Sequence, residues 1–198
     1  GKLDRTFVHS LESLVVEWTR EIKKAINVEP ETALNIAETK DIYHTPQFEL
    51  DFWKQKKANL TNLMGQLETE QIDLSIKILE KAQSTYVTGF KSLQEELQAS
   101  LNTATECLNC LKPLEEQFLD LSNDELTPEE YDEYYIPMMH MISLIWENCQ
   151  SYASINVICL LRQICNSIIA TIKTHVKVDS LWDDEEIEAT EKRILRCI

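Results

Sequence analysis

Glycine and proline are scarce in this chain, with three and five residues among 198. Tight turns and β-hairpins depend on these two residues, so an all-β or turn-rich fold is disfavoured. The glycines Gly1, Gly65 and Gly89 stand far apart. The sequence therefore has no Gly-rich loop whose backbone amides could approach the phosphates of ATP or a dinucleotide, and no Gly-x-Ser-x-Gly nucleophile motif.

Long hydrophobic runs are also missing. No stretch approaches the roughly 18 consecutive apolar residues of a membrane-spanning helix, and the N-terminus lacks the apolar run of a signal peptide. Because the chain begins with Gly1 and not with Met, we expect a piece cut from a longer protein.

Basic residues are outnumbered, with 19 Lys and Arg against 34 Asp and Glu, for a net charge of −15. Such a balance argues against non-specific binding to nucleic acid or to an anionic membrane. Lys54, Lys56 and Lys57 lie beside Phe52 and Trp53, and interleaved basic and aromatic residues can bind nucleic acid. In so acidic a chain we favour an inward aromatic pair with solvated lysines opposite.

Residues suited to metal binding or catalysis are scattered. Cys107 and Cys110 have the spacing of a metal or redox pair, but zinc needs two further ligands and no second close pair exists. The pair lies near the C-terminal end of an expected helix, where the dipole disfavours a thiolate. We predict no catalytic, cofactor-binding or metal-binding residue, and interpret the cysteines as buried, reduced thiols: Cys107, Cys110, Cys149, Cys159, Cys165 and Cys197.

What the chain has is helical periodicity. Between residues 70 and 112 the apolar positions step by three or four residues, and no proline interrupts them until Pro113. This pattern predicts one continuous helix, roughly 60 Å long, around which the remaining segments pack. Its apolar positions are Ile72, Ile76, Leu79, Ala82, Tyr86, Phe90, Leu93, Leu97, Leu101, Ala104, Leu108 and Leu111.

The same period predicts helices at 7–27, at 46–67, where Pro46 suits a first turn, and at 114–121. Residues 28–45 form a connector, with a short helical turn around 32–37. Thr127, Pro128 and Glu130 provide a helix start, and Pro137 kinks or restarts that helix, which continues to Cys149. The segment 155–176 is the most apolar helix and is expected to be largely buried. A last helix starts at Asp183 and uses Ile187, Ile194 and Leu195.

We therefore expect an all-α fold, an elongated bundle of long antiparallel helices. Residues 1–45 would hold the first helix and the connector, and residues 46–198 the bundle built on the helix at 70–112.

Several stretches together resemble the N-terminal tail, or stem, of dynein heavy chains. The series begins with the first helix and continues with Asp51-Phe52-Trp53 followed by Asn59-Leu60, a segment similar to the acidic–Phe–Trp…Asn–Leu signature of that tail. The resemblance covers nearly the whole chain in the right order, and these residues are closer to those of axonemal than of cytoplasmic dyneins. Only the break at Ser154–Val157 departs from the family pattern. The signature residues are Phe52, Trp53, Asn59, Leu60, Tyr86, Phe90, Trp146, Tyr152 and Asn166.

The resemblance implies a non-catalytic structural and assembly segment of a microtubule motor whose ATPase ring lies elsewhere in the parent chain. Its expected partners are other dynein heavy chains, intermediate chains and light chains, without nucleic acid or membrane. Microtubule contact would come only through the rest of the parent chain. The implied location is the cytoplasm and cytoskeleton, in the axoneme of a cilium. The alternative from the residues alone is a soluble helical adaptor or tethering rod unrelated to dynein.

Overall fold

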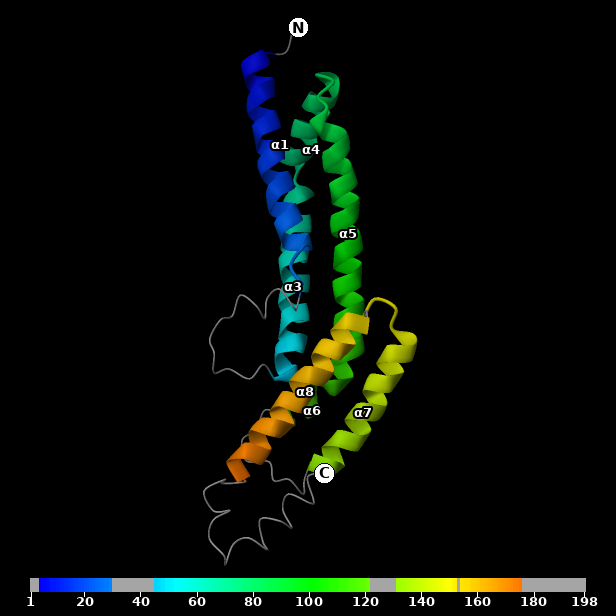
Figure 1. Cartoon of the computed structure of the whole chain (residues 1–198). Helices are drawn as coiled ribbons and strands as arrows, with labels where there is room; N and C mark the ends of the chain where they lie inside the picture. The colour runs from blue at the N-terminus through cyan, green and yellow to red at the C-terminus, as the bar shows by residue number, and fades with distance from the viewer. Residues whose placement is uncertain (1–3, 30–44, 122–130, 153, 176–198) are drawn as a thin grey trace, which may run out of the picture. The chain divides into compact units, whose positions relative to one another are not determined.

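The computed structural model describes residues 4–29, 45–121, 131–152 and 154–175 (Figure 1). All regular structure in these ranges is helical and they contain no strand, so the predicted all-α class is confirmed. No helix within them is long and apolar enough to cross a membrane. The helices are α1 (Arg5–Ile26), α3 (Pro46–Leu67), α4 (Glu70–Lys81), α5 (Tyr86–Leu111), the 3-10 turn η1 (Lys112–Leu114), α6 (Glu115–Leu121), α7 (Tyr131–Asn148) and α8 (Ser154–His175).

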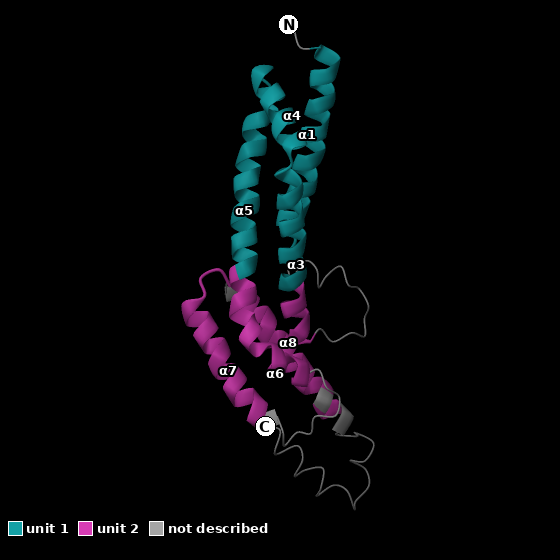
Figure 2. Cartoon of the chain, turned by 180° about the vertical axis from the view of Figure 1, so that it is seen from behind, with its two compact units in different colours: residues 1–32, 53–105 teal, residues 33–52, 106–198 magenta. Residues whose placement is uncertain are grey.

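The chain divides into two compact units (Figure 2). Unit 1 comprises residues 1–32 and 53–105, and unit 2 comprises residues 33–52 and 106–198. Each unit is described by itself below. The predicted division into residues 1–45 and 46–198, and the single elongated bundle, stay predictions.

The first helix of unit 1 begins and ends at well-formed caps. The side chain of Asp4 accepts a hydrogen bond from the backbone N–H of Thr6 at 3.0 Å, which satisfies one of the first-turn donors. The hydrogen bonds from Thr6 also lower the pKa of Asp4. At the other end the N–H of Asn27 bonds to the carbonyl of Lys23, and Lys23 and Lys24 complement the helix dipole. The helix predicted at 7–27 is confirmed.

Unit 1 is held together by apolar side chains from α1, α3, α4 and α5. In both views α1 and α4 lie side by side (Figures 1 and 2). The rings of Trp18 in α1 and Phe90 in α5 pack with centroids 6.0 Å apart. Tilted aromatic pairs at this distance are favourable beyond the area that they bury. The buried apolar residues of this unit include Leu11, Val15, Ile22, Trp53, Leu60, Leu79, Phe90, Leu93 and Leu97.

The prediction of one continuous helix over 70–112 is wrong. Helix α4 ends at Lys81, α5 begins at Tyr86, and Gln83 between them has a positive φ of 56°. The N–H of Ser84 bonds to the carbonyl of Leu79, and that of Gln83 to the carbonyl of Glu80. These two bonds form a Schellman motif, which terminates a helix through a left-handed residue.

The apolar spacing hid this break because its three- and four-residue steps continue across it. The chain reverses direction there, and α5 runs back along α4 (Figure 1). The Nζ of Lys91 in α5 lies 2.5 Å from the Oε1 of Glu80 in α4. Tyr86, which was expected in the buried stripe, is 48% exposed, and Val87 takes the inward position instead.

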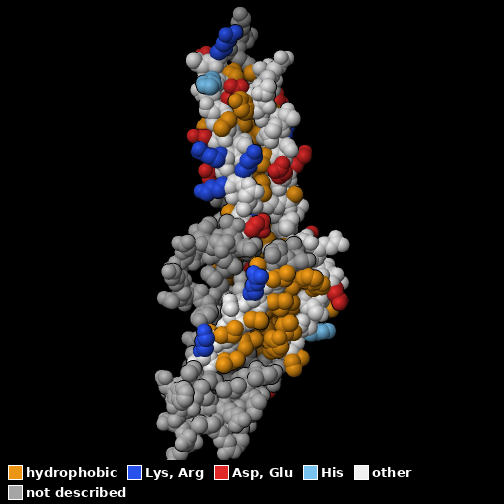
Figure 3. All heavy atoms as spheres, in the orientation of Figure 1, with side chains coloured by type: hydrophobic (Ala, Val, Ile, Leu, Met, Phe, Trp, Pro, Cys, Tyr) orange, Lys and Arg blue, Asp and Glu red, His pale blue; other side chains and the backbone are white. Residues whose placement is uncertain are grey.

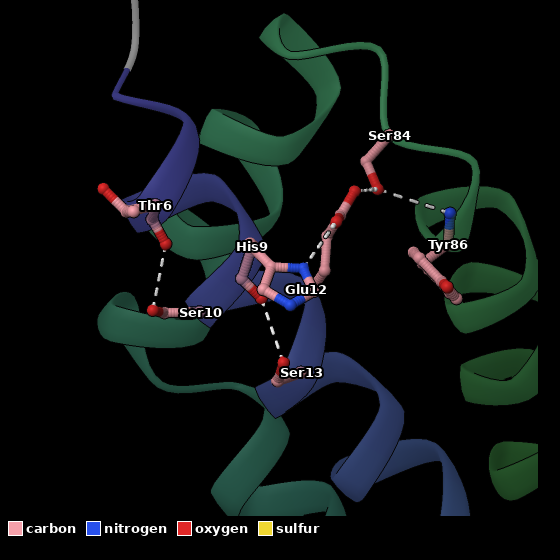
Figure 4. A network of polar contacts seen from close by, with 7 residues as sticks. All are labelled: Thr6, His9, Ser10, Glu12, Ser13, Ser84 and Tyr86. Atoms are coloured by element: carbon pink, nitrogen blue, oxygen red, sulfur yellow. Dashed lines mark hydrogen bonds and ion pairs between the residues drawn. The ribbon is translucent and has the colours of Figure 1, made fainter.

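Polar contacts tie this reversal to α1 (Figure 4). The hydroxyl of Ser84 donates to Oε1 of Glu12 at 2.7 Å and accepts from the N–H of Tyr86 at 3.4 Å. Glu12 also lies 3.8 Å from Nδ1 of His9 on the preceding turn of α1. A serine at this place therefore serves both as a start signal for α5 and as a contact between segments 72 residues apart.

Unit 2 is built from the first residues of α3, the last residues of α5, and η1, α6, α7 and α8. Pro113 lies in η1 directly after α5, so its predicted role as a helix end is confirmed. Pro137 lies inside α7, which continues past it. Helix α8 begins at Ser154, so residues 154–157, where a break was expected, are helical, and the interruption lies between Asn148 and Ser154. The buried apolar residues include Leu50, Leu111, Leu114, Phe118, Met138, Ile142, Val157, Leu160 and Ile164.

The expectation that α8 is largely buried is wrong. One face, with Val157, Leu160 and Ile164, is buried, and α8 contacts α6 and α7. On the opposite face Ile158 and Ile169 are 40% and 45% exposed. Four predicted features lie outside the described residues: the turn at 32–37, the helix start at Thr127, the last helix from Asp183, and the buried thiol of Cys197.

Candidate interaction surface

The nine signature residues fall into two groups by exposure. Four are buried and serve packing, namely Trp53, Leu60, Phe90 and Tyr152, and Phe52 is half-buried. The other four are exposed, namely Asn59, Tyr86, Trp146 and Asn166. Five of the nine belong to unit 1 and four to unit 2.

Lys56, part of the basic cluster considered for nucleic acid, is buried in unit 1. Its Nζ donates to the carbonyl of Val28 at 2.6 Å and lies 3.2 Å from Oε1 of Glu29, which is itself mostly exposed. The same Nζ stands 5.4 Å from the centre of the Trp53 ring, within the range of a cation–π contact. This arrangement joins α3 to the chain directly after α1. The inward Trp53 is as expected, whereas Lys56 points inward and not to solvent.

A buried polar cluster lies in unit 2 around Glu49, which is fully buried in the first turn of α3. The hydroxyl of Tyr152 donates to Oε1 of Glu49 at 2.9 Å, and Nε2 of Gln163 lies 3.5 Å from Oε2. The hydroxyl of Ser167 donates to the backbone carbonyl of Gln163 at 3.2 Å. A buried carboxylate needs such donors because leaving it unsatisfied costs several kcal/mol.

The environment of Tyr152 strongly favours its neutral form. Burial, together with the negative charge of Glu49 and the hydrogen bond to it, raises the pKa of Tyr152 far above its usual value. The cluster therefore acts as a fixed polar contact between α3 and the start of α8. Tyr152 therefore stays protonated near neutral pH.

The described thiols of unit 2 make contacts within that unit. Sγ of Cys107 lies 3.4 Å from the carbonyl of Ser151, and Cys110 hydrogen-bonds with Cys149 on the approach to the next helix. Burial, the contact with Cys149 and the charge of Glu106 raise the pKa of Cys110 to about 12. Within the described ranges no three His, Cys, Asp or Glu residues gather as metal ligands. Cys107 and Cys159 are buried as expected, but Cys110 and Cys149 are only half-buried and Cys165 is exposed, which corrects the interpretation of these three thiols.

The most distinctive surface feature is an apolar face on unit 2. Figure 3 shows hydrophobic side chains gathered over α8 and the neighbouring part of α7, with few charges among them. Monomeric soluble proteins rarely expose large contiguous patches of this kind, and such patches commonly mark contact sites. The exposed large apolar residues of unit 2 are Leu119, Tyr135, Ile136, Leu144, Trp146, Ile158 and Ile169.

On α7 this exposure follows a helical stripe. Ile136 is 66% exposed and Trp146 is 54% exposed, and with Met139 and Ser143 between them they recur at three- and four-residue steps. Trp is the residue type most enriched among those that dominate binding energy at protein interfaces. The α7 stripe, defined as Ile136, Met139, Ser143 and Trp146, is therefore a candidate contact surface.

A family model for the N-terminal region 1 of dynein heavy chains matches residues 8–198. The chain belongs to the dynein heavy chain N-terminal region family. It is 33% identical to a flagellar outer arm dynein beta chain of Chlamydomonas reinhardtii and 31% identical to a ciliary dynein beta chain of Tripneustes gratilla. It is 29% identical to the human dynein axonemal heavy chain 9. Each match covers 96% of this chain and 4% of the relative.

These matches confirm the resemblance drawn from the motifs. The dynein segment corresponds to an N-terminal region and not to the ATPase motor, in keeping with a non-enzymatic role. The segment spans about 4% of the length of these relatives.

Sequence reasoning missed three features of this dynein segment. Glu49 lies two residues before Asp51, and an acidic residue in the first turn of a helix carries no sequence signal of burial. The open face of α8 could have been suspected because apolar residues occupy more than one side of that helix. The exposure of Ile136 gave no sequence signal, since its spacing to Met139 is that of a core position.

Proposed function

We propose that this segment is a structural and assembly part of a dynein heavy chain tail, which joins the motor to associated chains through the α7 stripe. Its partners would be other dynein heavy chains, intermediate chains or light chains, and its place the axoneme of a cilium. The observation that supports this role is a set of exposed apolar side chains on α7, with Trp146 at its end, on a segment related to axonemal dyneins.

Two large apolar residues of the α7 stripe are left uncovered. Trp146 and Ile136 each leave more than half of the side chain in water, and covering such groups is favourable by roughly 25 cal/mol per Å² of apolar surface. A partner helix laid along α7 would contact residues at three- and four-residue steps, which is the usual mode of helix recognition.

The test is capture of dynein subunits from axonemal extract by the complete 198-residue chain, with the bound proteins identified by mass spectrometry. We expect intermediate chains or a second heavy chain. The W146A variant should lose at least about tenfold in captured subunit, in the range seen for interface tryptophans. V16A in unit 1 is the matched control, because Val16 is also an exposed apolar residue, and it should capture as much as wild type.

Circular dichroism melting of both variants would confirm that each is folded. Capture of no dynein subunit by the wild-type chain would contradict the proposal and favour the soluble adaptor. Equal losses of captured subunit for W146A and V16A would show that the α7 stripe does not make the contact.

A further inference from the structure

Two half-buried thiols of unit 2, Cys110 and Cys149, meet although they lie far apart in the sequence. Cys110 lies in the last turn of α5. Cys149 directly follows the last residue of α7, where its N–H bonds to the carbonyl of Ile145 at 2.9 Å. The thiol of Cys110 hydrogen-bonds with that of Cys149, and neither cysteine is in a disulfide. The proposed function makes no use of this pair.

Neighbouring contacts hold the two segments together at this place. Sγ of Cys107, one turn before Cys110, lies 3.4 Å from the carbonyl oxygen of Ser151, and the hydroxyl of Ser151 hydrogen-bonds with Oε2 of Glu106. Glu106, Cys107 and Cys110 share a face of α5, because residues three and four apart on a helix are neighbours. Cys149 stands two residues before Ser151, so the fold itself brings its thiol to the end of that face.

Exposure separates this pair from the other described thiols. Cys107 and Cys159 are fully buried, and a thiol buried in apolar surroundings is inert. A half-buried thiol can still be reached by an oxidant as small as hydrogen peroxide. Since the pKa of Cys110 is raised to about 12, this thiol keeps its proton near neutral pH, which leaves Cys149 as the sulfur that reacts first.

We propose that Cys110 and Cys149 are a site of reversible oxidation, at which a peroxide converts the thiol pair to a disulfide that ties the end of α7 to the last turn of α5. This proposal does not depend on the proposed function, because no partner chain takes part in it.

The chemistry proceeds in two steps. The thiolate of Cys149 attacks one oxygen of hydrogen peroxide and breaks the O–O bond, so that a sulfenic acid forms. The leaving hydroxide takes up the proton that the Cys149 thiol released and becomes water. The sulfur of Cys110 then attacks the sulfenic sulfur, the S–S bond forms, and the hydroxyl group leaves with the proton of Cys110 as a second water. Two electrons pass from the two sulfurs to the peroxide, and a reducing dithiol returns them.

The first test oxidises the complete, reduced chain with hydrogen peroxide, blocks the remaining thiols with N-ethylmaleimide, and identifies linked peptides by mass spectrometry. We expect the Cys110–Cys149 link to form at least about tenfold faster than any other disulfide, and dithiothreitol to remove it. In urea this preference should be lost, because the fold no longer brings the pair together. A folded chain in which other pairs link as fast, or in which peroxide oxidises Cys165 without linking Cys110 to Cys149, would overturn the proposal.

The second test measures the stability of the oxidised chain. A disulfide closes a loop in the unfolded state, so the urea midpoint of the oxidised wild-type chain should rise by roughly 1 M over that of the reduced chain. C165S, which removes an exposed thiol of the same unit, should show the same rise, and C149S should show none. A lower midpoint after oxidation of the wild-type chain would show that the fold does not place the two thiols for this bond.

The third test needs no oxidant. The arsenic of phenylarsine oxide binds two neighbouring thiols at once and releases one water. The reduced wild-type and C165S chains should bind it alike, whereas C110S and C149S should each lose at least about tenfold in affinity. Unchanged binding by C149S would assign the arsenic to another pair, such as Cys107 with Cys110 on one helix, and would contradict the proposal.

Discussion

The hydroxyl of Tyr152 donates a hydrogen bond to the carboxylate of Glu49 at 2.9 Å, across 103 residues of sequence and with both side chains buried. This contact joins the first turn of α3 to the turn that leads into α8, both in unit 2. It is the clearest case here of a polar residue whose place is set by tertiary structure, because neither partner has a local reason to be buried.

Replacing this tyrosine by phenylalanine isolates the hydroxyl. Y152F keeps the ring but leaves one oxygen of Glu49 without its donor, so the free energy of unfolding should fall by about 1–3 kcal/mol. Urea unfolding followed by circular dichroism measures this change. The control Y135F removes the hydroxyl of an exposed tyrosine and should change the free energy by less than about 0.5 kcal/mol. A Y152F chain as stable as wild type would mean that Glu49 does not depend on this donor.

The reversal at Gln83 allows a sharp test of the helix break. Since Gln83 has a φ of 56°, which costs an L-residue with a side chain about 1–2 kcal/mol, Q83G should stabilise unit 1 by roughly 0.5–1 kcal/mol. In a continuous helix the same substitution would destabilise the chain by about 1 kcal/mol. The sign of the change in urea unfolding therefore decides between the two structures. Q98G, inside α5, is the control and should destabilise.

The break between α4 and α5 could not be predicted from local sequence, although most of the other helix bounds could. Helix content, the bounds of α1 and α3, and the end of α5 before Pro113 followed from periodicity and proline placement, because these are local effects. Gln83 gave no local signal, since Gly or Asn is the usual residue at a left-handed helix end. The reversal is held by Ser84, which bonds Glu12 across 72 residues of sequence, and by Lys91, which pairs with Glu80 across 11 residues.

The surface was harder to predict than the core, for a related reason. Periodicity identifies which residues share a helix face, but it does not say whether another helix covers that face. Leu97 and Phe90 were correctly expected to be buried, whereas Trp146 and Ile158 have equally apolar neighbours and lie exposed. The same limit applies to the thiols, of which Cys107 is buried and Cys165 exposed.

Cys110 should stay protonated well above neutral pH. Its pKa rises from 9.0 to about 12 in the folded chain, so the unfolded state loses this proton first as the pH increases. Any stability linked to Cys110 is therefore present below pH 9.0 and is lost between 9.0 and about 12. The midpoint of urea unfolding, measured across this range, should decline less steeply for C110A than for wild type. An identical decline in the two chains would show that the thiol is not responsible.

The partner of that thiol offers an independent check. C149A removes a hydrogen bond and a charge that both raise the pKa of Cys110, so alkylation of Cys110 by iodoacetamide at a pH of about 8.5 should become faster. Peptide mass spectrometry measures the rate at this cysteine alone. C165A is the control, because Cys165 does not contribute to the shift, and it should leave the rate unchanged.

Lys56 is expected to stabilise unit 1 although lysines are usually surface residues. Its ammonium group is buried and donates to the carbonyl of Val28, so K56A would leave that carbonyl without its donor and remove the contact with the ring of Trp53. The free energy of unfolding should fall by about 1–3 kcal/mol. K57A, one residue away, should change it by less than about 0.5 kcal/mol. If both variants melted alike, Lys56 would be a solvated lysine after all, as its neighbours in the sequence first suggested.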